Sequence, residues 1–178
     1  MDRRQPLPRL WMMTDERQGE GLWRALDKLP EGSGVVFRHY SLAQAERRRA
    51  FDRVRGMVGS KACLLVLAGP PSLAALWGSD GSHGWEGAGD PNLVTSLSVH
   101  NAKEMEAANR LKPDLVFISP VFETRSHPGK PALGLEGLSA LAALATMPAV
   151  ALGGMNGTRA KELPDSVHGW AAIDGLTD

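Results

Sequence analysis

The stretch LVTSLSVHNAKEMEAANRLKPDLVFISPVF, residues 93–122, decides the fold. It starts with an apolar segment of strand character, continues with an amphipathic segment of helix character and ends with a second apolar run. Asn101 followed by Glu104 resembles a capping box at the start of the helix, and Pro113 ends that helix. Apolar strands joined through a helix are typical of parallel strands that helices cover on both faces.

The same alternation runs along the whole chain. Strands are expected at residues 9–15, 34–40, 62–69, 81–85, 93–100, 114–122, 149–155 and 169–176. Helices are expected between them, at residues 19–29, 42–58, 71–77, 101–111, 135–146 and 157–163. Strands and helices in this order predict one α/β domain over residues 1–178, a TIM (β/α)8 barrel with its site at the C-terminal strand ends. A flavodoxin-like open sheet is the alternative.

The chain is short for a barrel of this kind, which typically has roughly 250 residues. It has 178 residues, and the missing length can be located. A Gly-rich segment, residues 79–92, occupies the place of the fourth helix, and the sequence stops just after the last expected strand. We therefore expect a shortened barrel in which the fourth and eighth helices are reduced or missing.

The composition excludes several classes of protein. Twenty basic and twenty acidic residues cancel, so no net charge attracts nucleic acid or an anionic membrane. Cys63 is the only cysteine, which excludes a disulfide framework and a cysteine-based zinc site. No apolar run has the length of a transmembrane helix, and the N-terminus lacks the character of a signal peptide. We expect a cytoplasmic protein, and we leave a homodimer open as its assembly.

Polar side chains and glycines gather at the expected strand ends, where a barrel has its functional residues. Side chains alternate along a strand, so Arg38 and Tyr40 share one face, as do Ser98 and His100. A polar face at the end of an otherwise apolar strand is not explained by packing alone. The candidate site residues are Arg38, Tyr40, Ser98, His100, Thr124, His127, Gly153 and Gly154.

The pair Gly153-Gly154 follows the seventh expected strand, where barrels often bind phosphate. Paired glycines allow a close backbone approach, and free N–H groups beside a helix start bind phosphate well. A tight turn that needs positive φ is the alternative explanation. Among the histidines, His83 lies in the weakest strand and is expected to be structural. No histidine pair has the spacing of metal ligands, so no metal ligand is assigned.

With these strand ends in place, the sequence resembles the thiamine phosphate synthase and thiazole tautomerase superfamily over nearly its whole length. LWMMTDER is similar to the first strand, and DGSHGWE is similar to an Asp-Gly-Val-His-Leu-Gly segment. The block from SLSVH to GLEGL, residues 96–138, is the closest match, with Ser-x-His and Pro-Val-Phe-x-Thr in register. PAVALGGM and GWAAIDGL are similar to the last two strands.

The resemblance implies a transferase of thiamine biosynthesis. It would join hydroxymethylpyrimidine diphosphate to thiazole phosphate and release pyrophosphate, so that its partners are small phosphorylated thiamine precursors. The resemblance also implies that Mg²⁺ and cationic donors stabilise the departing diphosphate. It implies that Arg38 binds the diphosphate, that Ser98 and Thr124 supply hydroxyl groups, and that Gly153 and Gly154 bind the thiazole phosphate.

The sequence departs from the family pattern where the metal should bind. Ala68-Gly69 stands in the place of Asn-Asp after the third strand. The second metal-binding aspartate falls near Gly87 or Ala88. Since Mg²⁺ prefers oxygen ligands in near-octahedral geometry, its binding should be poor without these carboxylates.

Three further departures change the charge of the expected site. Tyr40 stands where the family has a lysine, and His127 replaces a lysine of the loop after the sixth strand. Asp174 replaces a serine next to the phosphate site, which puts a carboxylate where an anion should bind. The transferase therefore has a divergent active site.

Two alternative functions remain open at this point. A thiazole tautomerase needs no diphosphate chemistry, and His100 would move its proton, because imidazole can take and give a proton near neutral pH. A barrel without catalysis that binds a ligand or a partner protein is the other alternative. Asp174 and the tryptophans Trp77 and Trp85 beside the missing helix favour it, although tryptophan is also a common core residue.

Overall fold

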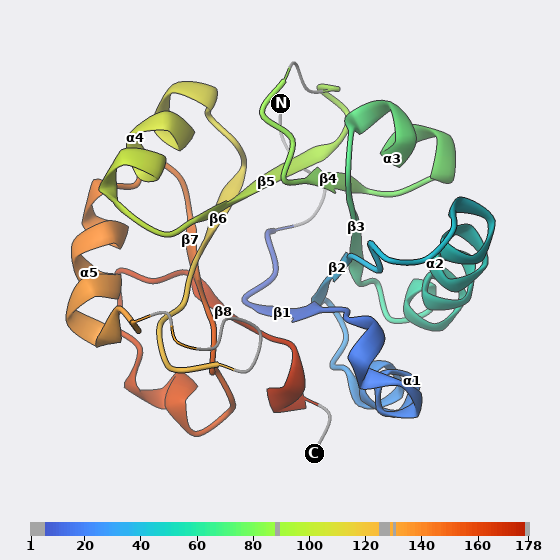
Figure 1. Ribbon diagram of the computed structural model, residues 1–178, viewed down its shortest axis with the longest axis horizontal. Coiled ribbons are helices and arrows are strands. Elements are labelled where there is room, and N and C mark those ends of the chain that lie inside the picture. Colours follow the sequence, from blue (N-terminus) through green and yellow to red (C-terminus); the bar gives the residue numbers. More distant parts are fainter. Residues whose placement is uncertain (1–5, 88–89, 125–128, 130, 177–178) are drawn as a thin grey trace.

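The computed structural model describes residues 6–87, 90–124, 129 and 131–176. Its strands are all parallel and form a closed barrel in chain order, with helices around the outside (Figure 1). The first strand pairs with both the second and the last strand, which closes the sheet. The predicted barrel is confirmed, and the open-sheet alternative is wrong.

The predicted strands are all present, but they are shorter than expected. They are β1 (Leu10–Met13), β2 (Gly34–Phe37), β3 (Leu64–Ala68), β4 (Gly81–His83), β5 (Val94–Val99), β6 (Leu115–Ile118), β7 (Ala149–Leu152) and β8 (Gly169–Ala172). The α-helices are α1 (Glu20–Lys28), α2 (Gln44–Gly59), α3 (Pro71–Trp77), α4 (Ala102–Leu111) and α5 (Gly134–Leu144). None of the helices in the described ranges has the length and apolar character needed to cross a bilayer.

Short 3-10 helices replace α-helices near the chain's end. The helix expected at residues 157–163 is wrong as an α-helix, because this segment forms only the 3-10 helix η2 (Arg159–Glu162). Gly157 and Pro164 flank it, and both residues disfavour a longer helix. After β8 the chain forms the 3-10 helix η3 (Asp174–Leu176), which agrees with the expected reduction of the eighth helix.

The strands divide the core into an inner and an outer layer, because their side chains alternate in direction. Inside the barrel, the fully buried rings of Trp11 and Phe117 meet edge to face, with their centroids 5.4 Å apart. Outside, Phe37 of β2 packs against Phe51 of α2. Trp77 joins this outer layer and is 4% exposed. Trp77 is therefore a core residue and does not form an open surface.

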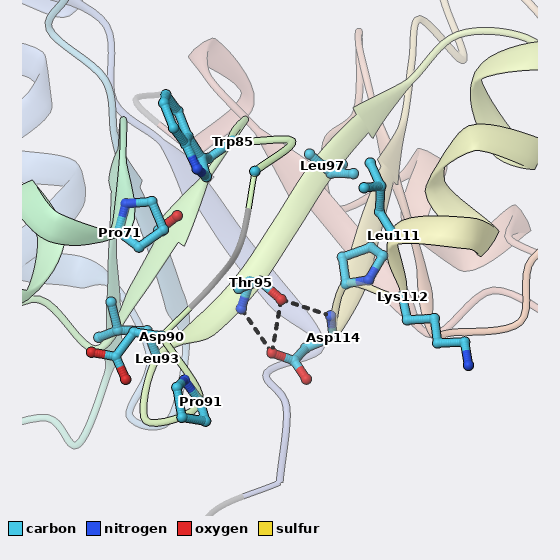
Figure 2. A pocket seen from close by; sticks show the side chains of 13 residues that line it. Pro71, Trp85, Asp90, Pro91, Leu93, Thr95, Leu97, Leu111, Lys112 and Asp114 are labelled. Atoms are coloured by element: carbon cyan, nitrogen blue, oxygen red, sulfur yellow. Dashed lines mark hydrogen bonds between the residues drawn. The ribbon is translucent and has the colours of Figure 1, made fainter.

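The described residues between β4 and β5, 84–87 and 90–93, contain no helix, as expected. A groove of about 290 Å³ opens there along the outer face of β5 (Figure 2). Trp85 borders one end of the groove and is 47% exposed. At the other end, the Asp114 carboxylate accepts hydrogen bonds from the backbone N–H of Thr95 at 2.7 Å and from its hydroxyl at 3.2 Å. The missing helix thus leaves part of the barrel wall uncovered.

Replacing Gly34 by alanine tests the packing inside the barrel. Gly34 pairs with Trp11 across β1 and β2, and an added Cβ would lie 2.1 Å from Trp11 Cε3. Because Trp11 is fully buried, Gly34→Ala should lower the free energy of unfolding by about 1–3 kcal/mol. Gly56→Ala in α2 is the control, since nothing lies within 4 Å of its added Cβ; it should raise the free energy of unfolding by about 0.5–1 kcal/mol. Urea unfolding measures both, and equal effects would contradict the prediction.

Candidate functional site

A small cavity lies at the C-terminal ends of the strands, and it brings together residues that are far apart in sequence. Its volume is about 80 Å³. The lining residues are Arg38, Ser119, Pro120, Thr124, Leu152, Gly153, Gly154, Met155, Ala172, Ile173, Asp174 and Gly175. Four of the residues predicted from the sequence, Arg38, Thr124, Gly153 and Gly154, are therefore neighbours. Tyr40, Ser98 and His100 are not among its lining residues.

Arg38 follows β2 and is held by the end of β1. Its backbone N–H donates to the hydroxyl of Thr14 at 3.0 Å, and its Nε donates to the Thr14 carbonyl at 2.8 Å. One of its terminal nitrogens donates to the Asp15 carboxylate at 2.9 Å. The same carboxylate also binds Arg17 at 2.7 Å. The guanidinium of Arg38 is thus held at the barrel mouth, and Asp15 partly balances its charge.

Gly153 and Gly154 form the turn after β7, and the positive φ expected for a tight turn is confirmed. Their φ angles are +96° and +63°, a region that disfavours other residues. A Cβ on Gly153 would lie 2.8 Å from the Cα of Pro120, and one on Gly154 would lie 2.6 Å from the carbonyl oxygen of Glu123. The glycines therefore make a tight turn against the loop that leads to Thr124, and they also line the cavity.

Asp174 lines the same cavity from the end of β8, so the predicted carboxylate does stand at the proposed anion site. The loop after β8 is tied to the loop after β1, because Gln18 Nε2 donates to the Ile173 carbonyl at 2.8 Å. The negative charge of Asp174 lies near Arg17, whose pKa is raised mainly by its hydrogen bond to Asp15 and further by the charge of Asp174. At the mouth of the barrel, the positive charges of Arg38 and Arg17 therefore lie beside the negative charges of Asp15 and Asp174.

Ser98 belongs to a second polar group, which lies inside the barrel. His83 of β4 is buried, with its Nδ1 2.9 Å from the hydroxyl of Ser96 and its Nε2 3.4 Å from the hydroxyl of Ser98. Burial, with a smaller effect of the Arg38 charge, lowers the pKa of His83 to about 4. The sequence pattern alone did not indicate this group, although pairing of neighbouring strands sets His83 beside Ser96 and could have indicated it.

Three other predicted residues have different positions. His100 follows β5, and its Nδ1 lies 2.7 Å from the carboxylate of Glu104, which also accepts from the His100 backbone N–H. The capping box expected at Asn101 is half formed: the Asn101 side chain accepts from the Glu104 backbone N–H at 3.0 Å, but the Glu104 carboxylate accepts from the His100 backbone N–H and the Asn101 side-chain amide. Tyr40 lies beyond the end of β2 and is 66% exposed. His127 lies outside the described residues.

A magnesium site does not fit the described residues. No three His, Cys, Asp or Glu side chains in this part of the chain lie close enough together to hold a metal ion. Ala68 ends β3 and Gly69 follows it, so neither supplies a side-chain oxygen there. Glu86 is exposed in the loop after β4, and Asp90 lines the outer groove instead of the mouth. We therefore derive no chemical step through Mg²⁺.

Comparison with known proteins gives a consistent picture. Residues 12–176 match the family model described as thiamine monophosphate synthase. A thiamine-phosphate synthase of Leuconostoc citreum is 32% identical over 162 residues, covering 82% of this chain and 76% of the relative. One of Vibrio campbellii is 26% identical over 185 residues, covering 94% of this chain and 89% of the relative.

A solved structure supports the same fold. The thiamine phosphate pyrophosphorylase from Pyrococcus furiosus is similar with a TM-score of 0.77 and 23% sequence identity. The similarity covers 96% of this chain and 87% of that chain. At this level of identity, the likeness shows that the barrel is shared.

Asp15→Asn tests the charge balance around Arg38. The hydrogen bond from Arg17, together with the charge of Arg38, lowers the pKa of Asp15 from 3.8 to about 2. A carboxyl pKa lowered by folding stabilises the fold above its unfolded-state value, and this contribution is lost as the pH falls through the folded-state value. We expect Asp15→Asn to lower the free energy of unfolding by about 1–2 kcal/mol at pH 7. The difference should shrink between about pH 4 and pH 2.

Urea unfolding of both proteins at pH 7, 4 and 2.5 measures this difference. The amide oxygen of asparagine can still accept from the backbone N–H of Arg17, as the carboxylate does at 3.0 Å. The substitution therefore removes the charge and leaves the local turn bonded. A difference in free energy that is the same at every pH would contradict the prediction.

Proposed function

This chain belongs to the thiamine monophosphate synthase family, and we propose that it joins hydroxymethylpyrimidine diphosphate to thiazole phosphate with release of pyrophosphate. The family match over residues 12–176 carries this proposal. The cavity supports it, because Arg38, Thr124, Gly153 and Gly154, which the resemblance assigns to substrate binding, line one space at the barrel mouth.

The proposed reaction mainly needs correct positioning of the two substrates and stabilisation of the departing diphosphate. Arg38 can supply a cationic fork to a phosphoryl oxygen, since guanidinium binds phosphate through parallel hydrogen bonds. Its Nε and one terminal nitrogen already bind Thr14 and Asp15, which limits its rotation. The turn of Gly153 and Gly154 lets a phosphate group approach the backbone closely.

The two alternatives are less well supported. The tautomerase hypothesis assigns proton transfer to His100, which binds Glu104 and does not line the cavity that contains Gly153 and Gly154. The hypothesis of a barrel without catalysis relied partly on Trp77, which is buried in the outer core. The relatives described above are synthases by name.

Small phosphorylated thiamine precursors are the proposed partners of the site. A cytoplasmic location remains part of this proposal, as does a homodimer. Mg²⁺ is implied by the family, but the described residues do not supply its ligands. Cationic side chains are therefore proposed to bind the diphosphate, and Arg38 is the cationic residue among those that line the described cavity.

Pyrophosphate release tests the proposed activity directly. The protein should release pyrophosphate from the two substrates in buffer with Mg²⁺, at a rate above that of the mixture without protein. Arg38→Gln should lower kcat/KM by about a hundredfold, because it removes a preorganised positive charge. Arg53→Gln, an exposed position on α2, is the matched control and should leave the rate unchanged. Absence of pyrophosphate release by the native protein would contradict the proposal.

Asp174→Ser tests the unusual carboxylate at the phosphate site. Asp174 lines the cavity beside Gly153 and Gly154, and like charges brought together at a binding site weaken binding. We expect Asp174→Ser to lower the KM for thiazole phosphate at least about threefold, with a smaller effect on the KM for the pyrimidine diphosphate. Asp165→Ser, near the opposite end of the barrel, is the control. A raised KM for thiazole phosphate in Asp174→Ser would show that the carboxylate assists binding.

A further inference from the structure

We propose that His83 is a positioning residue of this reaction, which fixes the hydroxyl of Ser98 at the mouth of the barrel. The inference rests on the proposed function, because it assigns His83 a part in that activity through Ser98. His83 lies on β4, the shortest of the strands, and its imidazole reaches across to two serines of the neighbouring β5.

The geometry places His83 beneath the mouth. Its Nδ1 lies 2.9 Å from the hydroxyl of Ser96, which is 1% exposed, and its Nε2 lies 3.4 Å from the hydroxyl of Ser98. Ser96 and Ser98 are two residues apart on one strand and therefore share a face. The ring is bound at its inner nitrogen by a buried serine, and its outer nitrogen meets the serine nearer the site.

Packing and charge restrict the ring further. The ring of Phe117 meets that of His83 at 76°, with the centroids 5.5 Å apart. The imidazole is neutral at pH 7, since burial and the charge of Arg38 lower its pKa to about 4. A neutral imidazole has one N–H donor and one acceptor nitrogen. Ser96 holds the ring in place, and the tautomer of the ring then determines whether the Ser98 hydroxyl donates to Nε2 or accepts from it, which fixes the hydroxyl direction.

A histidine inside the barrel is unusual among its neighbours. The residues packed inside it are otherwise mostly apolar, including Trp11, Val36, Val66 and Phe117. A polar ring in such surroundings lowers stability unless both of its nitrogens are bonded. An aliphatic side chain would fill this space without that requirement, so packing alone does not account for histidine. The charge of Arg38 also contributes to the lowered pKa of His83, which agrees with a ring close to the cavity's cationic residue.

Two substitutions of His83 separate positioning from folding. In His83→Asn the amide replaces the inner part of the ring and can bond to Ser96 but not reach Ser98. In His83→Gln the longer side chain reaches the position of Nε2 and can bond to Ser98. We expect His83→Asn to lower kcat by about tenfold to a hundredfold with a smaller change in KM. His83→Gln should recover most of the lost activity.

A double-mutant cycle with Ser98→Ala then tests whether His83 acts through Ser98. Positioning predicts that His83→Asn and Ser98→Ala lower kcat by similar factors, and that the double variant loses no more than either single variant. If the two losses in kcat multiply in the double variant, the two residues act independently and the proposal is overturned. Equal losses in His83→Asn and His83→Gln, accompanied by equal falls in melting temperature, would overturn it as well, because they indicate a structural role alone.

Binding of the pyrimidine diphosphate, measured by calorimetry, separates this inference from the proposed function. If the native protein releases pyrophosphate but the cycle is additive, the function holds and the role of His83 is wrong. If the native protein releases none, the proposed function is wrong, and weaker binding in His83→Asn with recovery in His83→Gln would still support the positioning of Ser98. In that second case, where no pyrophosphate is released, unchanged binding in His83→Asn or no binding by the native protein would overturn that role.

Discussion

Pairing between β1 and β8 closes the parallel sheet, and the positions of all the site residues depend on this closure. Because every strand runs in the same direction, the loops after β2, β6, β7 and β8 meet at one rim. Arg38, Thr124 and Gly153 come from three of these loops, yet they line a single cavity. The barrel tolerates the loss of a helix between β4 and β5 because the strands still pair on both sides.

Charge at the rim is compensated within the protein. Asp15 binds both Arg17 and Arg38, so the cation that faces the cavity already has an anionic partner. Asp174 brings a second carboxylate to the same space. In the proposed function, a phosphorylated substrate would share Arg38 with Asp15, so that the orientation of the guanidinium matters as much as its charge.

The sequence was sufficient to predict the strands and four residues of the cavity, because apolar runs and strand-end residues are local signals. The sequence could not show that β2 ends at Phe37. Beyond Phe37 the side chains no longer alternate between the two faces of the sheet, and Tyr40 is exposed. Trp77 ends an apolar segment and Trp85 lies among glycines, but only the structure shows that Trp85 borders the groove and Trp77 is buried. The role of His83 depends on the register between β4 and β5, which no single segment encodes.

The metal carboxylates that the family pattern has and this chain lacks belong to one side of the barrel. The residues that match the family lie on β5 or follow β2, β6 and β7, whereas the missing carboxylates belong after β3 and β4, next to the segment without a helix. Loss of the helix and loss of the metal ligands therefore affect neighbouring parts of the rim. His83 of β4 keeps its contact with Ser98 across this boundary. The turn after β7 keeps the two glycines of the family pattern, whereas Asp174, which lines the same cavity, departs from it.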